Sequence, residues 1–172
     1  MFTLAWIDLL LVQIAVMLLV WAAVSDATTF RISNRITVAI VLLYPAHVLA
    51  APQPVEWLGA CLIAAGVFAL GIPAFARGWF GGGDVKLFAA ASLWAGPAMF
   101  PSMLLVTGLA GGLLGIFALL WSRFGWMLPY RFAAAPAGAE GAERRPSFRT
   151  HVPYGVAIAA GGVASLLPLL AR

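Results

Sequence analysis

Apolar runs, separated by short polar or proline-containing breaks, fill most of this chain of 172 residues. The apolar residues follow one another continuously and do not alternate with polar ones, which is typical of helices that cross a membrane. Six runs cover residues 4–24, 36–51, 57–76, 87–100, 101–121 and 153–170. The pattern predicts an all-α, polytopic membrane protein with about six transmembrane helices, and a turn near Gly96-Pro97 or Pro101 between the fourth and fifth.

The composition supports the same fold class. Hydrophobic residues make up 63% of the chain and charged residues only 9%, whereas a soluble domain carries about 25% charged residues. Six spans of roughly 20 residues leave no room for a separate soluble domain, so residues 1–172 are expected to form a single membrane-embedded domain with one long loop at 122–152. The single cysteine, Cys61, excludes an internal disulfide and a cysteine-based zinc site, and we expect no metal or other cofactor.

The basic residues indicate the orientation in the membrane. With six spans, the segments 25–35, 77–86 and 122–152 lie on one side, and they hold nine of the ten Lys and Arg residues. The positive-inside rule makes this side cytoplasmic and places both termini on the other side. The same residues are scattered between apolar runs and form no basic face, so we expect a lipid bilayer as the environment and no nucleic-acid partner. Asp8 within the first run, and the lack of a basic start, indicate that this run stays as a helix.

Two acidic residues, Asp26 and Asp84, are expected at the same cytoplasmic membrane edge. Asp26 follows the end of the first apolar run, where the helix dipole disfavours a carboxylate. Asp84 precedes the fourth run, where a helix-capping role is the alternative interpretation. The preceding segment, 81–83, consists of three glycines, which permit a close backbone approach that side chains would prevent. A substrate strand lying against these glycines would require such an approach.

A pair of neighbouring carboxylates that is partly shielded from water can perform acid–base chemistry. Both groups do not ionise easily, so one keeps its proton while the other is charged. The charged group activates water, and the protonated group donates to the scissile carbonyl or the leaving amine. Cys61 and His47 lie inside apolar runs and His151 stands alone. The sequence therefore presents no rival catalytic set, and the pair indicates aspartic peptidase chemistry.

Three short motifs resemble those of the prepilin peptidases, a family of membrane-embedded G-x-G-D aspartic peptidases. The motifs are Gly81-Gly82-Gly83-Asp84 followed by Val85-Lys86-Leu87, then Asp26 followed by Ile32-Ser33-Asn34, and finally Pro153-Tyr154-Gly155. In the second motif Ser33 stands where the family pattern has proline, a departure that affects loop rigidity more than chemistry. With the six spans, the resemblance covers nearly the whole chain.

The resemblance implies a function for these residues. Asp26 and Asp84 would be the catalytic pair that cleaves the leader of type IV pilin precursors at the cytoplasmic face of the bacterial inner membrane. Gly81 and Gly83 would shape the loop that presents Asp84. Lys86 would have a supporting role, toward an acidic group of the substrate, or would only anchor the topology. Long family members carry an insertion with paired Cys-x-x-Cys motifs and methylate the new N-terminus. This chain has a single cysteine and no such insertion. It therefore resembles the short form associated with Tad or Flp pili, in which methyl transfer is not expected.

Two other functional classes stay open from the residues alone. A small transporter or channel component would use Asp26 and Asp84 as cation or proton sites, although such sites lie more naturally near the bilayer midplane on broken helices. A noncatalytic assembly subunit would pack through glycine-rich helix faces. These faces are formed by Gly108, Gly111, Gly112 and Gly115 in the fifth run and by Gly161 and Gly162 in the sixth. They are suited to close helix packing, either within the chain or in a homodimer.

Overall fold

The structure, a computed structural model, describes residues 2–124 and 153–170, and every regular element in this part of the chain is an α-helix. The helices are α1 (Phe2–Thr29), α2 (Asn34–Ala50), α3 (Trp57–Ala76), α4 (Gly82–Phe124) and α5 (Tyr154–Leu170). By length and composition α1, α3 and α4 can cross a membrane, while α2 and α5 are shorter apolar helices. The predicted all-α membrane fold is confirmed.

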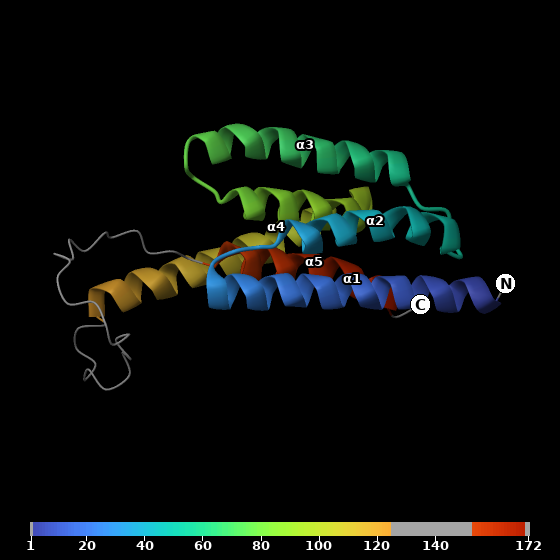
Figure 1. Ribbon diagram of the computed structural model, residues 1–172, viewed down its shortest axis with the longest axis horizontal. Helices are drawn as coiled ribbons and strands as arrows, with labels where there is room; N and C mark the ends of the chain where they lie inside the picture. Colours follow the sequence, from blue (N-terminus) through green and yellow to red (C-terminus); the bar gives the residue numbers. More distant parts are fainter. Residues whose placement is uncertain (1, 125–152, 171–172) are drawn as a thin grey trace.

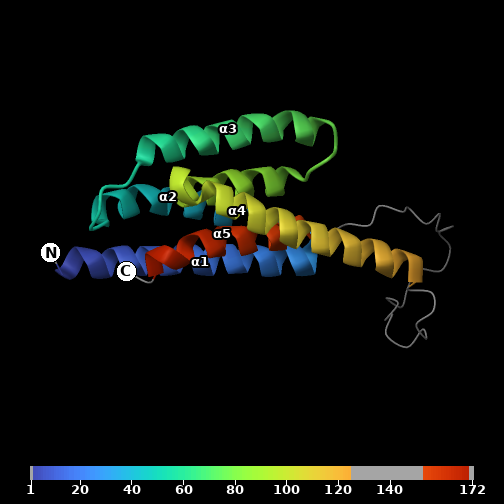
Figure 2. The ribbon, with the colours of Figure 1, turned by 180° about the vertical axis from the view of Figure 1, so that it is seen from behind.

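Helix α4 consists of two segments that run in opposite directions. Gly96 interrupts it with φ 58° and ψ −177°, a left-handed backbone conformation that glycine adopts without steric cost. Figures 1 and 2 both show the chain running out beside α3, turning, and returning beside α5. The five assigned helices thus provide six segments. The turn lies at Gly96 and not at Pro101, which is inside the second segment.

Helix α1 extends beyond the end that its apolar run predicts. It continues to Thr29, so Asp26 lies in its last turns and not after its end. The hydroxyls of Thr28 and Thr29 donate hydrogen bonds of 2.7 Å to backbone carbonyls four residues earlier, which lets these polar residues continue the helix. Phe30, with φ 52°, then ends it. The expectation that Asp26 follows the helix was wrong, because hydropathy marks the end of the apolar run and not that of the helix.

The six segments alternate in direction, so their connections gather at two ends. The connections α1–α2 and α3–α4, the last residues of α4 and the first of α5 share one end (Figure 1, left), and both chain termini lie at the other. We call these the aspartate end, which holds Asp26 and Asp84, and the opposite end. Within the expected loop 122–152, residues 122–124 belong to α4, and 125–152 lie outside the described residues.

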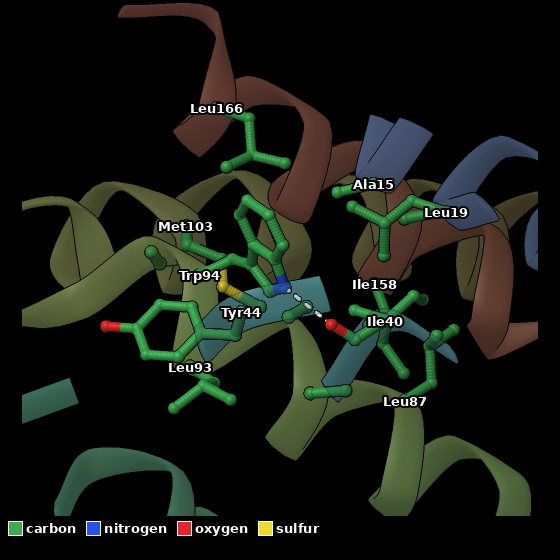
Figure 3. Packing of buried hydrophobic residues seen from close by; sticks show 14 of the residues in the cluster. Ala15, Leu19, Ile40, Tyr44, Leu87, Leu93, Trp94, Met103, Ile158 and Leu166 are labelled. Atoms are coloured by element: carbon green, nitrogen blue, oxygen red, sulfur yellow. Dashed lines mark hydrogen bonds between the residues drawn. The ribbon is translucent and has the colours of Figure 1, made fainter. Parts of the chain in front are cut away.

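The core lies between α1, α2, α5 and α4, and the first segment of α4 contributes the largest share of its buried residues. On α5, a Cβ added at Gly161 would overlap the Thr107 hydroxyl, and one at Gly162 would lie 3.0 Å from Leu19, so these glycines serve contacts within the chain. Gly108, Gly112 and Gly115 face open space instead. The indole N–H of Trp94 donates to the Ile40 carbonyl at 2.9 Å and ties α4 to α2 (Figure 3). The largest fully buried side chains include Leu19, Ile40, Leu87, Met103 and Leu166.

Candidate active site

Asp26 is held by the beginning of α5. Its side chain is buried, with 6% of the residue exposed, and its Oδ2 accepts a hydrogen bond of 2.7 Å from the Gly155 backbone N–H. Gly155 is the second residue of α5, so its N–H has no partner within the helix, and the positive end of the helix dipole faces the carboxylate. The start of one helix thus stabilises an acid near the unfavourable end of another.

Gly155 is a positioning residue that the sequence reasoning did not assign to the site. A Cβ at this position would lie 2.8 Å from Asp26 Oδ2 and 2.9 Å from its Cβ and Cγ. Any other residue would therefore displace the carboxylate or the start of α5. The signal was present in Pro153-Tyr154-Gly155, because a glycine directly after a helix start has no advantage unless something approaches it closely.

Asp84 lies in the first turn of α4 and folds back onto the glycine loop. Its Oδ2 accepts a hydrogen bond of 3.2 Å from the Gly81 backbone N–H, and a Cβ at Gly81 would lie 2.8 Å from the same oxygen. Gly81 therefore occupies a position where a side chain would push the carboxylate away. The structure thus places Gly81 beside the Asp84 carboxylate.

The two aspartate motifs touch at two further points. A Cβ at Gly83 would lie 3.1 Å from the Cβ of Ile32, so glycine allows α4 to begin directly against the α1–α2 connection. Lys86 Nζ donates a hydrogen bond of 3.0 Å to Asn34 Oδ1. Since Ile32 and Asn34 belong to the Asp26 motif, these contacts join two motifs that are far apart in the sequence.

Asp26, in the last turn of α1, and Asp84, in the first turn of α4, lie at the same end of the bundle, where the two aspartate motifs contact each other. Among the described residues neither forms an ion pair with a cation, and each accepts a hydrogen bond from one backbone N–H. When two partly shielded acids come close together, one of them can keep a proton while the other is ionised. Such a pair can donate and accept a proton in the same reaction.

A third acid has a different environment at the opposite end. Asp8 Oδ1 accepts a hydrogen bond from His47 Nδ1, and both side chains are largely buried. The His47 ring stacks on Trp94, with ring centroids 5.0 Å apart and planes 27° apart. Asp8 therefore has a hydrogen-bond partner inside the protein. His47 is buried, packed and hydrogen-bonded.

Comparison with known proteins assigns the family. Residues 13–116, more than half of the chain, match the sequence profile of the type IV leader peptidase family. The chain belongs to this family. It is also similar to the prepilin leader peptidase/N-methyltransferase of Bacillus subtilis (strain 168), with 35% identity over 121 residues, 70% of this chain and 49% of that protein. The chain thus spans about half the length of this relative. No solved structure matches the chain.

The region that matches the family contains both aspartates and the whole glycine loop. The structure brings all five residues predicted for the site, Asp26, Gly81, Gly83, Asp84 and Lys86, to the aspartate end. Three further residues, Ile32, Asn34 and Gly155, complete the arrangement. Ile32 and Asn34 lie inside the matched region, whereas Gly155 lies outside it.

Proposed function

We propose that this protein is an aspartic endopeptidase that cleaves the leader of type IV, Flp-like pilin precursors at the cytoplasmic edge of the bacterial inner membrane. One observation carries the proposal. Asp26 and Asp84, 58 positions apart in sequence, lie at the same end of the bundle, each held by a glycine N–H and neither paired with a cation among the described residues.

The pair would hydrolyse a peptide bond by moving two protons. The ionised carboxylate takes a proton from a water molecule as the water oxygen attacks the scissile carbonyl carbon, while the protonated carboxyl donates its proton to the carbonyl oxygen. The resulting diol then collapses. The C–N bond breaks, the leaving amine receives the proton that came from water, and the diol returns the other proton, so the pair regains its starting state. Methyl transfer is not part of the proposed function.

The basic residues support the cytoplasmic placement of the site. Arg31, Arg35, Arg77 and Lys86 all lie in or beside the connections at the aspartate end, and basic residues are enriched on the cytoplasmic side of membrane proteins. A pilin-like precursor with a cytoplasmic leader and a membrane helix would present its scissile bond at this depth. The bilayer and the precursor are thus the proposed partners.

The alternative function, a transporter or channel component, has less support in the geometry. The broken helix of this bundle is α4, and its break at Gly96 is close to α3 at Ala60, at the opposite end from Asp26 and Asp84. An ion site on a broken helix would place the acidic residues at the break. A homodimer through the glycine-rich faces stays a prediction, now restricted to Gly108, Gly112 and Gly115, which face open space.

The decisive experiment co-expresses the protein with a Flp-type prepilin and follows removal of the leader by gel shift. We expect wild-type protein to convert the precursor, and we expect Asp26→Asn and Asp84→Asn each to abolish conversion. Glu56→Gln is the matched control, because Glu56 is an exposed carboxylate whose side chain makes no capping hydrogen bond. Full cleavage by either aspartate variant would rule out the paired mechanism. An equal loss of conversion in Glu56→Gln would show that the assay measures differences in expression level and not in catalysis.

A further inference from the structure

A lateral groove lies between α2, α3 and the first segment of α4. It has a volume of about 570 Å³, within the usual range for ligand sites. Val38, Val41 and Leu42 from α2 form one wall, Ala64 and Phe68 from α3 face them, and Ala89, Ala90 and Leu93 from α4 form the floor. Its three polar residues, Asn34, Thr37 and Lys86, lie toward one end. The groove is therefore apolar along its length and polar only at the aspartate end.

The groove exists because α3 packs on α4 and has few contacts with α2. Gly71 and Gly59 allow α3 to approach α4 closely, since a Cβ at Gly71 would overlap the Val85 side chain and one at Gly59 would lie 2.6 Å from Pro97. The α2 wall has no such partner: Val38 is 53% exposed and Leu42 is 70% exposed. The groove is thus open along its side toward the apolar phase of the membrane.

The groove is continuous with the candidate active site. Lys86, at its polar end, is two residues from Asp84 on the same helix, and it is hydrogen-bonded to Asn34 of the other aspartate motif. From residue 34 to residue 42 of α2 the groove extends about 12 Å, at a rise of 1.5 Å per residue. This length corresponds to two turns of a helix.

We propose that this groove receives the apolar helix of the substrate precursor, so that the polar end of the bound segment reaches Asp26 and Asp84. The inference rests on the proposed function and specifies where that substrate binds. A membrane helix enters sideways from the bilayer, and the groove has its open side there. Its apolar walls would contact the side chains of that helix, and its polar residues lie where the helix would give way to the extended scissile segment.

A lipid acyl chain is the competing occupant, but the position of the groove favours a substrate. A lipid site has no need to end within two residues of a catalytic carboxylate. A peptidase that cuts next to a membrane helix must hold that helix in register with its acids, since misplacement by about 1 Å can reduce a rate 100-fold. The groove provides two turns of contact for this purpose.

The first test fills the groove. Ala64→Phe places a ring in the groove, whereas the neighbouring Ala65→Phe places the same ring on an exposed face of α3 that does not line it. We expect Ala64→Phe to reduce conversion of the full precursor by about tenfold or more and Ala65→Phe to change it by less than about twofold. Equal conversion by both variants, with wild-type protein active, would overturn the groove inference and leave the proposed function standing.

The second test does not depend on cleavage or on the folding of a filled groove. A photo-crosslinking amino acid replaces Phe68, which lines the groove, or Leu70, which is 77% exposed and does not, in the Asp84→Asn background with a tagged precursor. We expect a protein–precursor adduct from position 68 at several times the yield from position 70. Equal yields, or adducts from position 68 with lipid only, would overturn the inference. If wild-type protein fails to cleave, the proposed function fails, and an adduct would still show a helix-binding groove.

Discussion

The aspartate end and the opposite end of the bundle each hold buried or partly buried carboxylates, in different surroundings. At the opposite end, Asp8 is hydrogen-bonded to His47, which stacks on Trp94. At the aspartate end, the only hydrogen-bond partners of the Asp26 and Asp84 carboxylates among the described residues are backbone N–H groups. The Asp8 group joins α1, α2 and α4 through side chains that satisfy one another, which is a structural arrangement.

The difference shows how a membrane protein separates stability from chemistry. A carboxylate with a dedicated side-chain partner is held in place by that partner, and its removal leaves the partner without a hydrogen bond. A carboxylate that is held only by a backbone N–H can still gain and lose a proton. The comparison therefore predicts rate effects at one end and stability effects at the other, and four substitutions test it.

The largest effect is expected for Asp26→Asn. Loss of one acid–base group should lower the cleavage rate by about 100- to 10,000-fold, because asparagine cannot exchange a proton. Its amide oxygen can still accept the Gly155 N–H, so the thermal unfolding midpoint in detergent should stay close to that of the wild type. A large fall in that midpoint would show that Asp26 has a structural role, as Asp8 has.

A smaller effect, on stability, is expected for His47→Leu at the opposite end. The substitution leaves the largely buried Asp8 carboxylate without its partner, which should lower the free energy of unfolding by about 1 to 3 kcal/mol. Cleavage by the folded fraction should be unchanged. Denaturant unfolding in detergent, together with the gel-shift assay at equal folded concentration, measures both quantities. A loss of cleavage without a loss of stability would contradict the proposed separation.

Gly155→Ala should reduce cleavage by about tenfold, an effect of about 1.4 kcal/mol on the barrier. The added Cβ would lie less than 3 Å from the Asp26 carboxylate and must displace it. The control is Gly66→Ala in α3, where a Cβ meets nothing within 4 Å. We expect the control to cleave at the wild-type rate, and comparable losses in both variants would remove Gly155 from the site.

The smallest effect is expected for Lys86→Met, which keeps the apolar stem but removes the donor to Asn34. Because the hydrogen bond is exposed, its loss should cost less than about 1 kcal/mol and reduce cleavage less than about fivefold. Asn34→Ala should have a similar effect. In the double variant the two losses should not add, since both remove the same contact. Full additivity would mean that Lys86 acts independently of Asn34, for instance on the substrate.

Much of the fold could be predicted from the sequence because a bilayer imposes simple rules on it. Apolar runs marked every helix, and 57–76 coincides with α3. The turn within α4 was placed at one of two positions, and only the structure chose Gly96, whose positive φ suits glycine. The end of α1 was missed, because the hydrogen bonds of Thr28 and Thr29 extend the helix through polar residues that hydropathy assigns to a loop.

For the site, the sequence by itself determined which residues are candidates for the chemistry. Carboxylates are costly near a membrane, so two acids that lack an evident surface role stand out in the sequence alone. Only the tertiary structure decided what holds them. The Gly155 N–H reaches Asp26 across 129 positions, and Asp8 meets His47 across 39. Contacts of this kind depend on how helices are placed beside one another, which the local pattern of polar and apolar residues does not encode.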